Sequence, residues 1–363
     1  MAGVPEFDIT GVTADMKRHV KRILIDSVHD GPDMFEVTFI NQSDSPSNAH
    51  DFTDNQQGQF GQPIKIGDEL EITMGFVSDQ QETVIKGEVT GVESVYRSDG
   101  ASEFVVRGYD KLHRLTRGRK QRTFLNMKDS AIADQIAGEA GLSAGSEDSK
   151  TVHDHVFQNN MSDLQFLYSR ARLIGFEVDL EDDKLIFAPP RVKGGAIAEL
   201  SLGHDTRSVR FRVSTSAQIK EVQVRGWDPV KKKEIVGKSK TGDEYSTLGG
   251  KKAGGKMVSG KYGSGGSGIE MINNVPVKDK AHADEIAKGR LNALAMELIQ
   301  GEAVVEGNPK LRAGKVISFK DCDDTFDGDY YITRAVHISD ADKVDGGGYT
   351  TRLQFKSAGT SAL

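Results

Sequence analysis

The sequence has one cysteine in 363 residues, Cys322, which excludes an internal disulfide framework and a cysteine-rich zinc site. The first thirty residues lack an apolar run of the length that a signal peptide or a membrane anchor needs. An excess of positive charge is missing too, because the net charge is −7. We therefore expect a chain that folds in the cytoplasm, has no membrane anchor and does not bind nucleic acid through bulk electrostatics.

What is present suits a β-rich protein of several units. The chain is 37% hydrophobic and 28% charged, which is ample for packed cores in about two to four structural units. Its 40 glycines are more than usual and indicate many turns.

Residues 1–115 show the two-residue periodicity of strands. In Met34–Ile40 apolar residues alternate with Glu36 and Thr38, and Leu70–Phe76 repeats the pattern. Further strands are expected at Arg22–Ser27, Thr83–Tyr96 and Ser102–Tyr109. This segment predicts a small antiparallel barrel or sandwich, and we take residues 1–115 as a first β-barrel. The polar stretch Asn41–Gln62 reads as a long surface loop, for which contact with a partner is one reason.

Residues 116–195 switch to an alternating helix and strand pattern. One helix is expected over Ser130–Ala140, capped by Asp129 or Ser130 and stopped by Gly141. A second helix is expected from Ser162 to Gly175. A hairpin of Phe176–Leu180 and Leu185–Phe187 follows, after a strand at Thr151–Gln158. We interpret the segment as an α/β insertion domain.

Residues 196–229 and 300–363 are expected to form a second, discontinuous β-barrel, with strands at Ser208–Val213, Ile219–Trp227 and Glu302–Glu306. The intervening residues 230–299 begin with a Lys/Gly/Ser-rich stretch, residues 231–268, which predicts an excursion that is flexible or ordered by a partner. A helix over His282–Leu298 closes this insertion.

An internal repeat links the two barrels. The pattern of Ile64–Ile72 recurs at Leu311–Phe319, and downstream Gly87 aligns with Gly328 and Val95 with Val336. The fold class predicted from these segments is α+β, mainly β, with two tandem duplicated β-barrels that carry α/β insertion domains.

The stretch Gly108–Gly118 and the residues after it are dense in cations. Three interpretations stay open: contact with nucleic acid, salt bridges across a subunit interface, and a solvated surface. We favour the interface, because arginine is enriched there and forms fixed bidentate pairs. The residues assigned to it are Arg107, Lys111, Arg114, Arg117 and Arg119.

The run RGYDKLHRLTRGRKQRTFLNMKDSAIADQIAGEAGL, residues 107–142, resembles the phage late control gene D family, whose relatives include the hub portions of VgrG spikes and of extracellular contractile injection particles. The runs VEGNPKLRAGKVISF, FDGDYYITRAVH and GGGYTTRLQF are similar to that family as well. These are scaffold motifs, moderately specific together and weak singly, and the resemblance covers nearly the whole chain.

The resemblance implies a structural baseplate hub that trimerises and adapts a six-fold inner tube to a three-fold spike. Expected partners are two further copies, the tube protein, other baseplate components and a separate spike chain, because no needle repeat follows before Leu363. Assembly would start in the bacterial cytoplasm and end in a virion or injection particle. Alternatives are a tail-associated peptidoglycan hydrolase and an assembly chaperone that is absent from the mature particle.

No segment predicts a cofactor, a metal or a catalytic group. His153 and His155 share a strand face but lack a recognisable third ligand. Five aspartates between Asp321 and Asp329 resemble a calcium loop, but Arg334 stands where its bidentate Glu belongs, so we favour an exposed turn. Cys322 has no base partner nearby. We expect no enzymatic activity.

Overall fold

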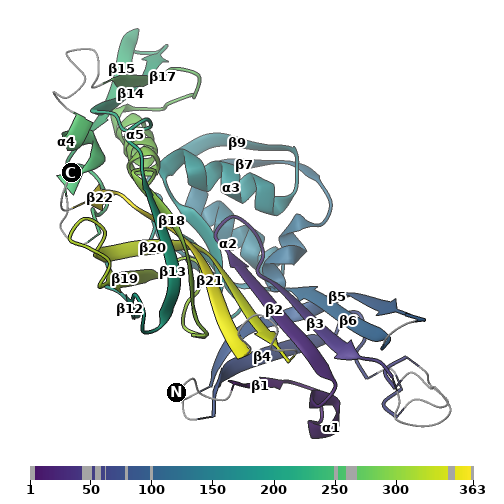
Figure 1. The fold of residues 1–363 in the computed structure, drawn as a ribbon. Coiled ribbons are helices and arrows are strands. Elements are labelled where there is room, and N and C mark those ends of the chain that lie inside the picture. Colours follow the sequence, from purple (N-terminus) through teal and green to yellow (C-terminus); the bar gives the residue numbers. More distant parts are fainter. Residues whose placement is uncertain are drawn as a thin grey trace. The chain divides into compact units, whose positions relative to one another are not determined.

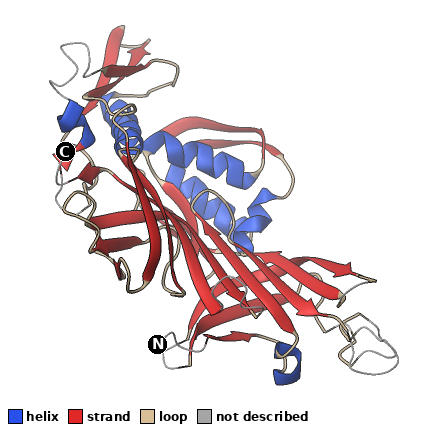
Figure 2. Cartoon of the chain, viewed as in Figure 1, coloured by secondary structure: helices blue, strands red, loops and turns tan. Residues whose placement is uncertain are grey.

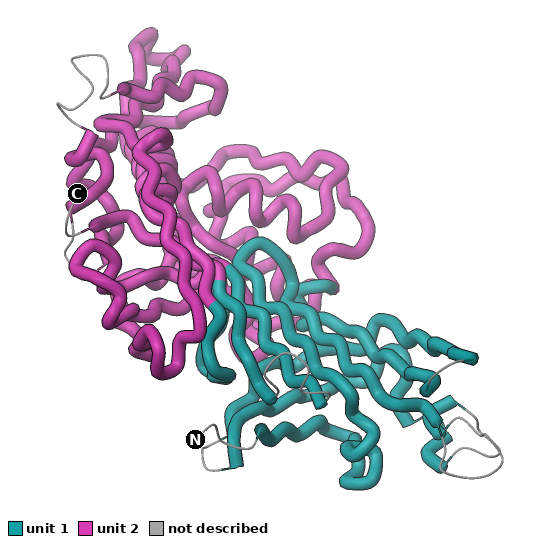
Figure 3. The backbone as a smooth tube through the Cα atoms, in the orientation of Figure 1, with its two compact units in different colours: residues 1–113, 304–312, 334–353 teal, residues 114–303, 313–333, 354–363 magenta. Residues whose placement is uncertain are grey.

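A computed structural model describes residues 5–42, 51–53, 59–61, 63–77, 81–98, 101–248, 252–258, 268–341 and 348–360. The chain forms two compact units, coloured separately in Figure 3. Unit 1 contains residues 1–113, 304–312 and 334–353, and unit 2 contains residues 114–303, 313–333 and 354–363. Strands dominate both, and helices are confined to a few segments (Figure 2).

The first set of six strands is hydrogen-bonded in the order β1-β4-β5-β6-β3-β2. Its members are β1 (Pro5–Ile9), β2 (Val20–Val28), β3 (Met34–Ile40), β4 (Glu69–Phe76), β5 (Glu82–Val95) and β6 (Glu103–Tyr109), with the short helix α1 (Ala14–Lys17) between β1 and β2. Every strand pairing in this set is antiparallel, as expected from the alternating patterns.

A second set of six strands repeats this order, as β12-β19-β20-β21-β18-β13 (Figure 1). Its members are β12 (Glu199–Ser201), β13 (Thr206–Val213), β18 (Ile299–Glu306), β19 (Val316–Lys320), β20 (Gly328–Asp340) and β21 (Gly348–Ser357); the two-residue strand β22 (Gly359–Thr360) follows. In chain order both sets read 1-4-5-6-3-2, although β12 pairs with β19 in parallel and β1 with β4 antiparallel. The α+β, mainly β prediction with a duplicated β unit is confirmed.

The duplicated hairpins share their hydrogen bonds. Gly67 N–H donates to Val89 O at 2.8 Å, and Val89 N–H donates to Asp68 O at 2.9 Å. Gly314 N–H donates to Ile332 O at 2.9 Å, and Ile332 N–H donates to Lys315 O at 2.8 Å. Val89 therefore corresponds to Ile332, and the predicted downstream alignment was wrong by two residues. A shift of two keeps every side chain on its face, so periodicity could not reveal it.

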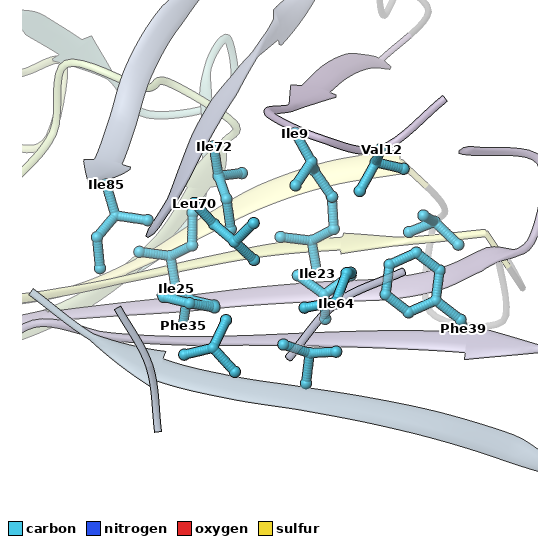
Figure 4. Close-up of a cluster of buried hydrophobic side chains, with 14 of the residues drawn as sticks. Ile9, Val12, Ile23, Ile25, Phe35, Phe39, Ile64, Leu70, Ile72 and Ile85 are labelled. Carbon is cyan, nitrogen blue, oxygen red and sulfur yellow. The ribbon is translucent and has the colours of Figure 1, made fainter. Parts of the chain in front are cut away.

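The core of unit 1 is built from the inward residues of these strands (Figure 4). Ile23, Ile25, Phe35 and Ile72 are fully buried there. Phe52 is fully buried too, and its ring stacks on that of Phe104 at 5.8 Å between centroids. The prediction of a surface loop over Asn41–Gln62 was therefore wrong at Phe52, because one aromatic can anchor a polar segment. The rest of that segment lies largely outside the described residues.

Unit 2 has an aromatic core beneath its strands. Phe211, Phe319, Tyr330 and Phe355 all have ring centroids within 5.6 Å of one another. Phe355 lies against Gly301, where an added Cβ would meet its ring at 2.3 Å. Such aromatic-over-glycine packing fills the space that the missing side chain leaves.

Along the chain, an α/β segment of unit 2 lies between the two sets of strands. It contains η1 (Lys111–Thr116, which begins in unit 1), β7 (Lys120–Lys128), α2 (Asp129–Glu139), β8 (Ser143–Ser146), β9 (Val152–Met161), α3 (Asp163–Ile174), β10 (Glu177–Glu181) and β11 (Lys184–Ala188). Ser162 forms a capping box with Gln165, and Gly175 ends α3 at a φ of 72°, as predicted. The predicted cap of α2 was wrong: Lys128 occupies that position and makes no side-chain cap.

A second α/β segment lies between β13 and β18. It contains β14 (Glu221–Asp228), β15 (Lys233–Lys240), β16 (Lys252–Ala253), α4 (Gly254–Val258), β17 (Ile269–Ile272) and α5 (Lys280–Ala295). The Lys-rich stretch predicted to be an excursion is thus a strand at Lys233–Lys240, because Ile235 is buried against α5. Gly237 permits the close approach, since its Cβ would meet Ala283 C at 2.2 Å. The domain ranges given above remain a prediction.

Candidate interaction surfaces

Two of the five predicted interface cations, Arg107 and Lys111, lie in unit 1 and are already paired. Arg107 Nε donates to Glu36 Oε2 at 2.7 Å and Nη1 donates to Glu93 Oε2 at 2.5 Å. These hydrogen bonds, Glu36 first, raise the pKa of Arg107 above its ordinary value. Lys111 Nζ lies 2.9 Å from Glu69 Oε1. Both cations are therefore engaged in ion pairs within the chain.

The other three, Arg114, Arg117 and Arg119, lie in unit 2. Arg114 Nη1 donates to Ala140 O at 3.1 Å, where a cation complements the end of α2. Arg119 Nη1 donates to Asn160 O at 3.2 Å. The exposed Arg117 has no ion pair with any described residue. The assignment of the five cations to a subunit interface stays a prediction.

The two histidines of the predicted pair, His153 and His155, lie in different environments. His155 is exposed, whereas His153 is buried with its Nε2 3.0 Å from Asp129 Oδ2. Arg170 donates to both carboxylate oxygens of Asp129, at 2.6 and 3.0 Å. Burial raises the pKa of Asp129, but the hydrogen bonds from His153 and Arg170 outweigh it, so the pKa is lowered. No group of three ligands that could hold a metal exists among the described residues.

The pairing of Asp129 with Arg170 and His153, which brings together α2, α3 and β9, was not predicted from the sequence. His282 of α5 joins them, with its ring 5.1 Å from that of His153 in a T-shaped arrangement. Burial first, then the charges of His153 and Arg170, lower the pKa of His282 to about 4. This polar cluster joins the two α/β segments of unit 2; Asp129, His153 and His282 are buried in it, and Arg170 is partly exposed.

The aspartates between β19 and β20 close a turn. Asp323 Oδ1 accepts from Thr325 N at 2.8 Å and from Phe326 N at 3.1 Å, and Asp327 Oδ1 accepts from Cys322 N at 3.0 Å. Carboxylates used in this way cap backbone donors, which agrees with the turn that we favoured. Burial, followed by Asp327, raises the pKa of the Cys322 thiol, so this sulfur is not activated as a nucleophile.

Strand edges offer a different kind of surface. Within unit 1, β2 pairs antiparallel with Arg334–Asp340 of β20, and Arg334 binds Asp26 with two hydrogen bonds of 2.8 and 2.6 Å. The counterpart of that stretch in the first set is the end of β5. Among the described residues, β6 alone pairs with Gly91–Val95. Val92 there is 43% exposed, whereas its counterpart Ala335 is fully buried.

Apart from an isolated bridge between Thr206 and Leu202, the one strand that pairs with β13 within the described part of the chain is β18, so its outer edge is likewise open. Arg210 and Arg212 of β13 line a groove of about 390 Å³ with Gln300, Gln354 and Lys356. Arg210 lies 3.6 Å from Glu302, but Arg212 has no ion pair with any described residue. The edge strand β13 thus carries one cation in this groove, Arg212, without an ion pair among the described residues.

Comparison with known proteins adds family and fold. Residues 10–340 match the family described as the Alg8 N-terminal domain. No curated protein matches the sequence. No helix in the described ranges is long and apolar enough to cross a membrane.

Solved structures share the fold at low sequence identity. The 43 kDa tail protein of prophage MuSo2 from Shewanella oneidensis is 14% identical with a TM-score of 0.67, and the match covers 98% of this chain and 99% of that one. A tail protein from Neisseria meningitidis is 15% identical with a TM-score of 0.66, over 98% and 97% of the two chains.

A third relative in structure is an Escherichia coli component of the type VI secretion system, described as similar to the T4 bacteriophage tail proteins gp27 and gp5. It is 12% identical with a TM-score of 0.58, over 97% of this chain and 76% of that one. The chain thus has the fold of these tail and secretion-system proteins.

Proposed function

The chain belongs to the Alg8 N-terminal domain family, and from this premise we propose that it is the structural baseplate hub of a contractile tail or contractile injection particle. Three copies would form a ring that adapts a six-fold inner tube to a three-fold spike. We assign it no catalytic role. Its partners would be a separate spike chain, the tube protein and other baseplate components, met in the particle after assembly in the bacterial cytoplasm.

The observation that carries this proposal is the repeated strand order 1-4-5-6-3-2. A chain with two alike β units offers two alike contact positions, so three chains offer six. A head-to-tail contact that is repeated from copy to copy forms a closed ring when the successive rotations add up to a full turn. The fold shared with phage tail proteins supports this use of the duplication.

The pairing of β2 with β20 inside unit 1 suggests how neighbouring copies would meet. By the repeat, β13 is the counterpart of β2 and the end of β5 is the counterpart of Arg334–Asp340. We therefore propose that the outer edge of β13 in one copy pairs antiparallel with Gly91–Val95 of the next copy. Pairing would cover Val92, as Ala335 is covered within the chain.

The register of this contact follows from the repeat. Aligning Ile23 and Ile25 of β2 with Val209 and Phe211 of β13 places Arg212 where Asp26 stands, and Asp26 lies opposite Val336. The counterpart of Val336 is Glu93. Arg212 of one copy would thus face Glu93 of the next, an opposite-charge cross-strand pair. Arg107, which binds Glu93 within the chain, would orient that carboxylate.

A charge swap tests the contact. We expect Arg212→Glu and Glu93→Arg each to convert the ring to monomers, because a like-charge pair would face each other across the strands. Combining both changes should restore the ring. Light scattering on the full chain measures the mass, and Lys193→Glu, an exposed lysine in a loop, is the matched control. A ring that survives both single changes would contradict the proposed contact.

The five predicted interface cations are tested in the same assay. Arg114→Glu with Arg117→Glu should block ring formation while the monomer stays folded, as judged by circular dichroism. If the ring persists, that stretch is not the interface, and the β13 edge alone would carry it. Incubation of the purified chain with peptidoglycan should leave its turbidity unchanged, since no catalytic role is assigned.

A further inference from the structure

Helix α5 brings the second α/β segment of unit 2 against the first, where it packs on α3 (Figure 1). In the middle of the helix the contact is close and apolar, since a Cβ on Gly289 would meet Gly175 N at 2.5 Å. Near the start of the helix the contact is polar, and Glu285 accepts a hydrogen bond of 3.1 Å from Thr151, just before β9. The joint between the two segments therefore has an apolar part and a polar part.

His282 lies in the polar part of this joint and is 3% exposed. Its Nδ1 accepts from Lys278 N–H at 3.3 Å, so the proton of the neutral ring is on Nε2. Nε2 is buried and has no hydrogen-bond partner among the described residues. The ring of His153 stands edge-on to that of His282, 5.1 Å away between centroids. The joint thus contains a neutral imidazole whose one acceptor is already in use.

The geometry opposes a second proton on His282. The proton would have to bind at Nδ1, where the Lys278 N–H already points, and two donors cannot share a hydrogen bond. His282 N–H donates to the N-cap Asp279 at 2.9 Å, so the ring belongs to the first turn of α5, where the helix dipole disfavours a cation. Burial also removes the water that would hydrate an imidazolium.

The charged and titratable groups around His282 come from α2, β9, α3 and the start of α5: Asp129, His153, Asp154, Arg170, Lys278, Asp279 and Glu285. Asp129 would favour a cation, but Arg170 binds both of its oxygens and repels a second cation. Lys278 and Asp154 pair with each other at 2.6 Å. Burial raises the pKa of Glu285, so this carboxylate loses its charge early in acid. β14 and β15 cover the other side of α5 with apolar residues.

We propose that His282 makes this joint an acid-sensitive latch, in which protonation of the ring separates the first turn of α5 from β9 and opens the polar part of the joint. The released imidazolium is hydrated, while Asp129 and Arg170 stay bound to each other in the first segment. The two sets of strands stay folded, because their cores are built from other residues. The inference does not depend on the proposed function, since it concerns a movement within unit 2.

Hydrogen exchange of the full chain, followed by mass spectrometry at pH 7 and pH 5, tests the proposal. Once the intrinsic exchange rate at each pH is divided out, residues 278–286 should lose protection about 20-fold at pH 5, because the pKa of His282 is about 4 in the closed joint and about 6.5 in the released turn. At both pH values these residues should stay less protected than β20.

Two neutral variants separate the latch from a structural role of the same side chain. His282→Asn and His282→Gln each keep an acceptor for Lys278 N–H and bind no proton, so each should abolish the change in protection between the two pH values. His337→Gln is the matched control: it removes the buried histidine of unit 1, whose pKa is also lowered, and should leave the response of residues 278–286 in place.

Three results would overturn the inference. The first is protection of residues 278–286 that does not change between pH 7 and pH 5. The second is a loss of protection in acid that persists in both neutral variants, which would mean that His282 fills space without sensing the proton. The third is equal protection of residues 278–286 and β20 at pH 5, which would mean that acid unfolds the chain as a whole.

Discussion

The hairpins β4–β5 and β19–β20 have the same backbone and different surroundings. In each, the turn that precedes the first strand holds a glycine in the left-handed region, Gly67 before β4 at a φ of 96° and Gly314 before β19 at 80°. The same four backbone atoms form the same two hydrogen bonds. At the first turn Ile66 is 66% exposed, whereas at the second Lys315 Nζ binds Glu181 of β10 at 2.8 Å.

This difference shows how a duplicated unit acquires separate tasks. The residue before Val89 is Glu88, which lies 2.7 Å from His113 of η1. The residue before Ile332 is Tyr331, whose hydroxyl donates to Glu177 of β10 at 2.5 Å. The same strand position in each repeat thus binds a segment that lies outside the six-strand sets, η1 in the first and β10 in the second, through different side chains. The glycine turn maintains the same backbone conformation in both repeats, while the side chains differ and bind different partners.

The largest expected effect comes from the cores of the two hairpins. Phe319 and Ile72 occupy equivalent positions and are fully buried. Phe319→Ala should cost about 3–5 kcal/mol of unfolding free energy, and Ile72→Ala about 2–5 kcal/mol, because each leaves a cavity. Hydrogen exchange followed by mass spectrometry should localise the first loss to unit 2 and the second to unit 1. Loss of protection in both units from either change would show that they do not unfold separately.

A second comparison concerns how acid lowers the stability of the two units. His337 in unit 1 donates to Leu311 O at 2.8 Å and accepts from Tyr349 at 2.7 Å, and burial lowers its pKa to about 4, as for His282 in unit 2. Since the folded pKa lies below the unfolded value, the unfolded chain binds the proton first, and stability falls as the pH drops from about 6.5 towards 4.

Between pH 7 and pH 5 each histidine should remove about 2 kcal/mol. Urea unfolding at both values measures the difference, with His337→Gln and His282→Gln each expected to flatten it by about half. A pH dependence that neither change alters would rule out both groups.

The third comparison concerns the residues that hold the neighbouring segments. Tyr331→Phe removes the hydroxyl that Glu177 accepts from, and Glu88→Gln weakens the pair with His113. Each should cost about 1–2 kcal/mol, because a partly buried group loses its charged or hydrogen-bonded partner. Thermal unfolding measures the loss. Faster hydrogen exchange in Glu177–Ala188 should follow the first change and not the second.

The smallest expected loss of stability should be nearly equal in the two repeats. Gly67→Ala and Gly314→Ala each place a Cβ in the left-handed region, at a cost of about 1 kcal/mol. No atom lies closer than 3.5 Å to the added carbon at either site, so backbone strain is the whole effect. Midpoints of urea unfolding that differ widely between the two variants would argue against equivalent turns.

Periodicity predicted most strands of the two repeats, since alternation reports which side of a sheet is buried. It also predicted α3 from Ser162 and Gly175, whose capping chemistry is local. Three features depend on distant partners and were missed. Lys233–Lys240 became a strand because α5 covers Ile235, Phe52 is buried by aromatic neighbours, and Asp129 binds Arg170 in place of capping its helix.

The candidate surfaces show the same limit. Arg107 and Lys111 were identified as cations, but their carboxylate partners come from other strands. The open edges of β13 and β5 could not be predicted, because an edge is defined by strands that are absent from it. The strand order was needed to recognise Arg212 and Glu93 as counterparts of a pairing already present within the chain.

The most direct test of the hub proposal is electron cryo-microscopy of particles purified from producing cells. We predict three copies of this chain in a closed ring where tube meets spike, with β13 of each copy beside the end of β5 of the next. A particle that lacks the chain, or that holds it in another number or without this strand contact, would contradict it.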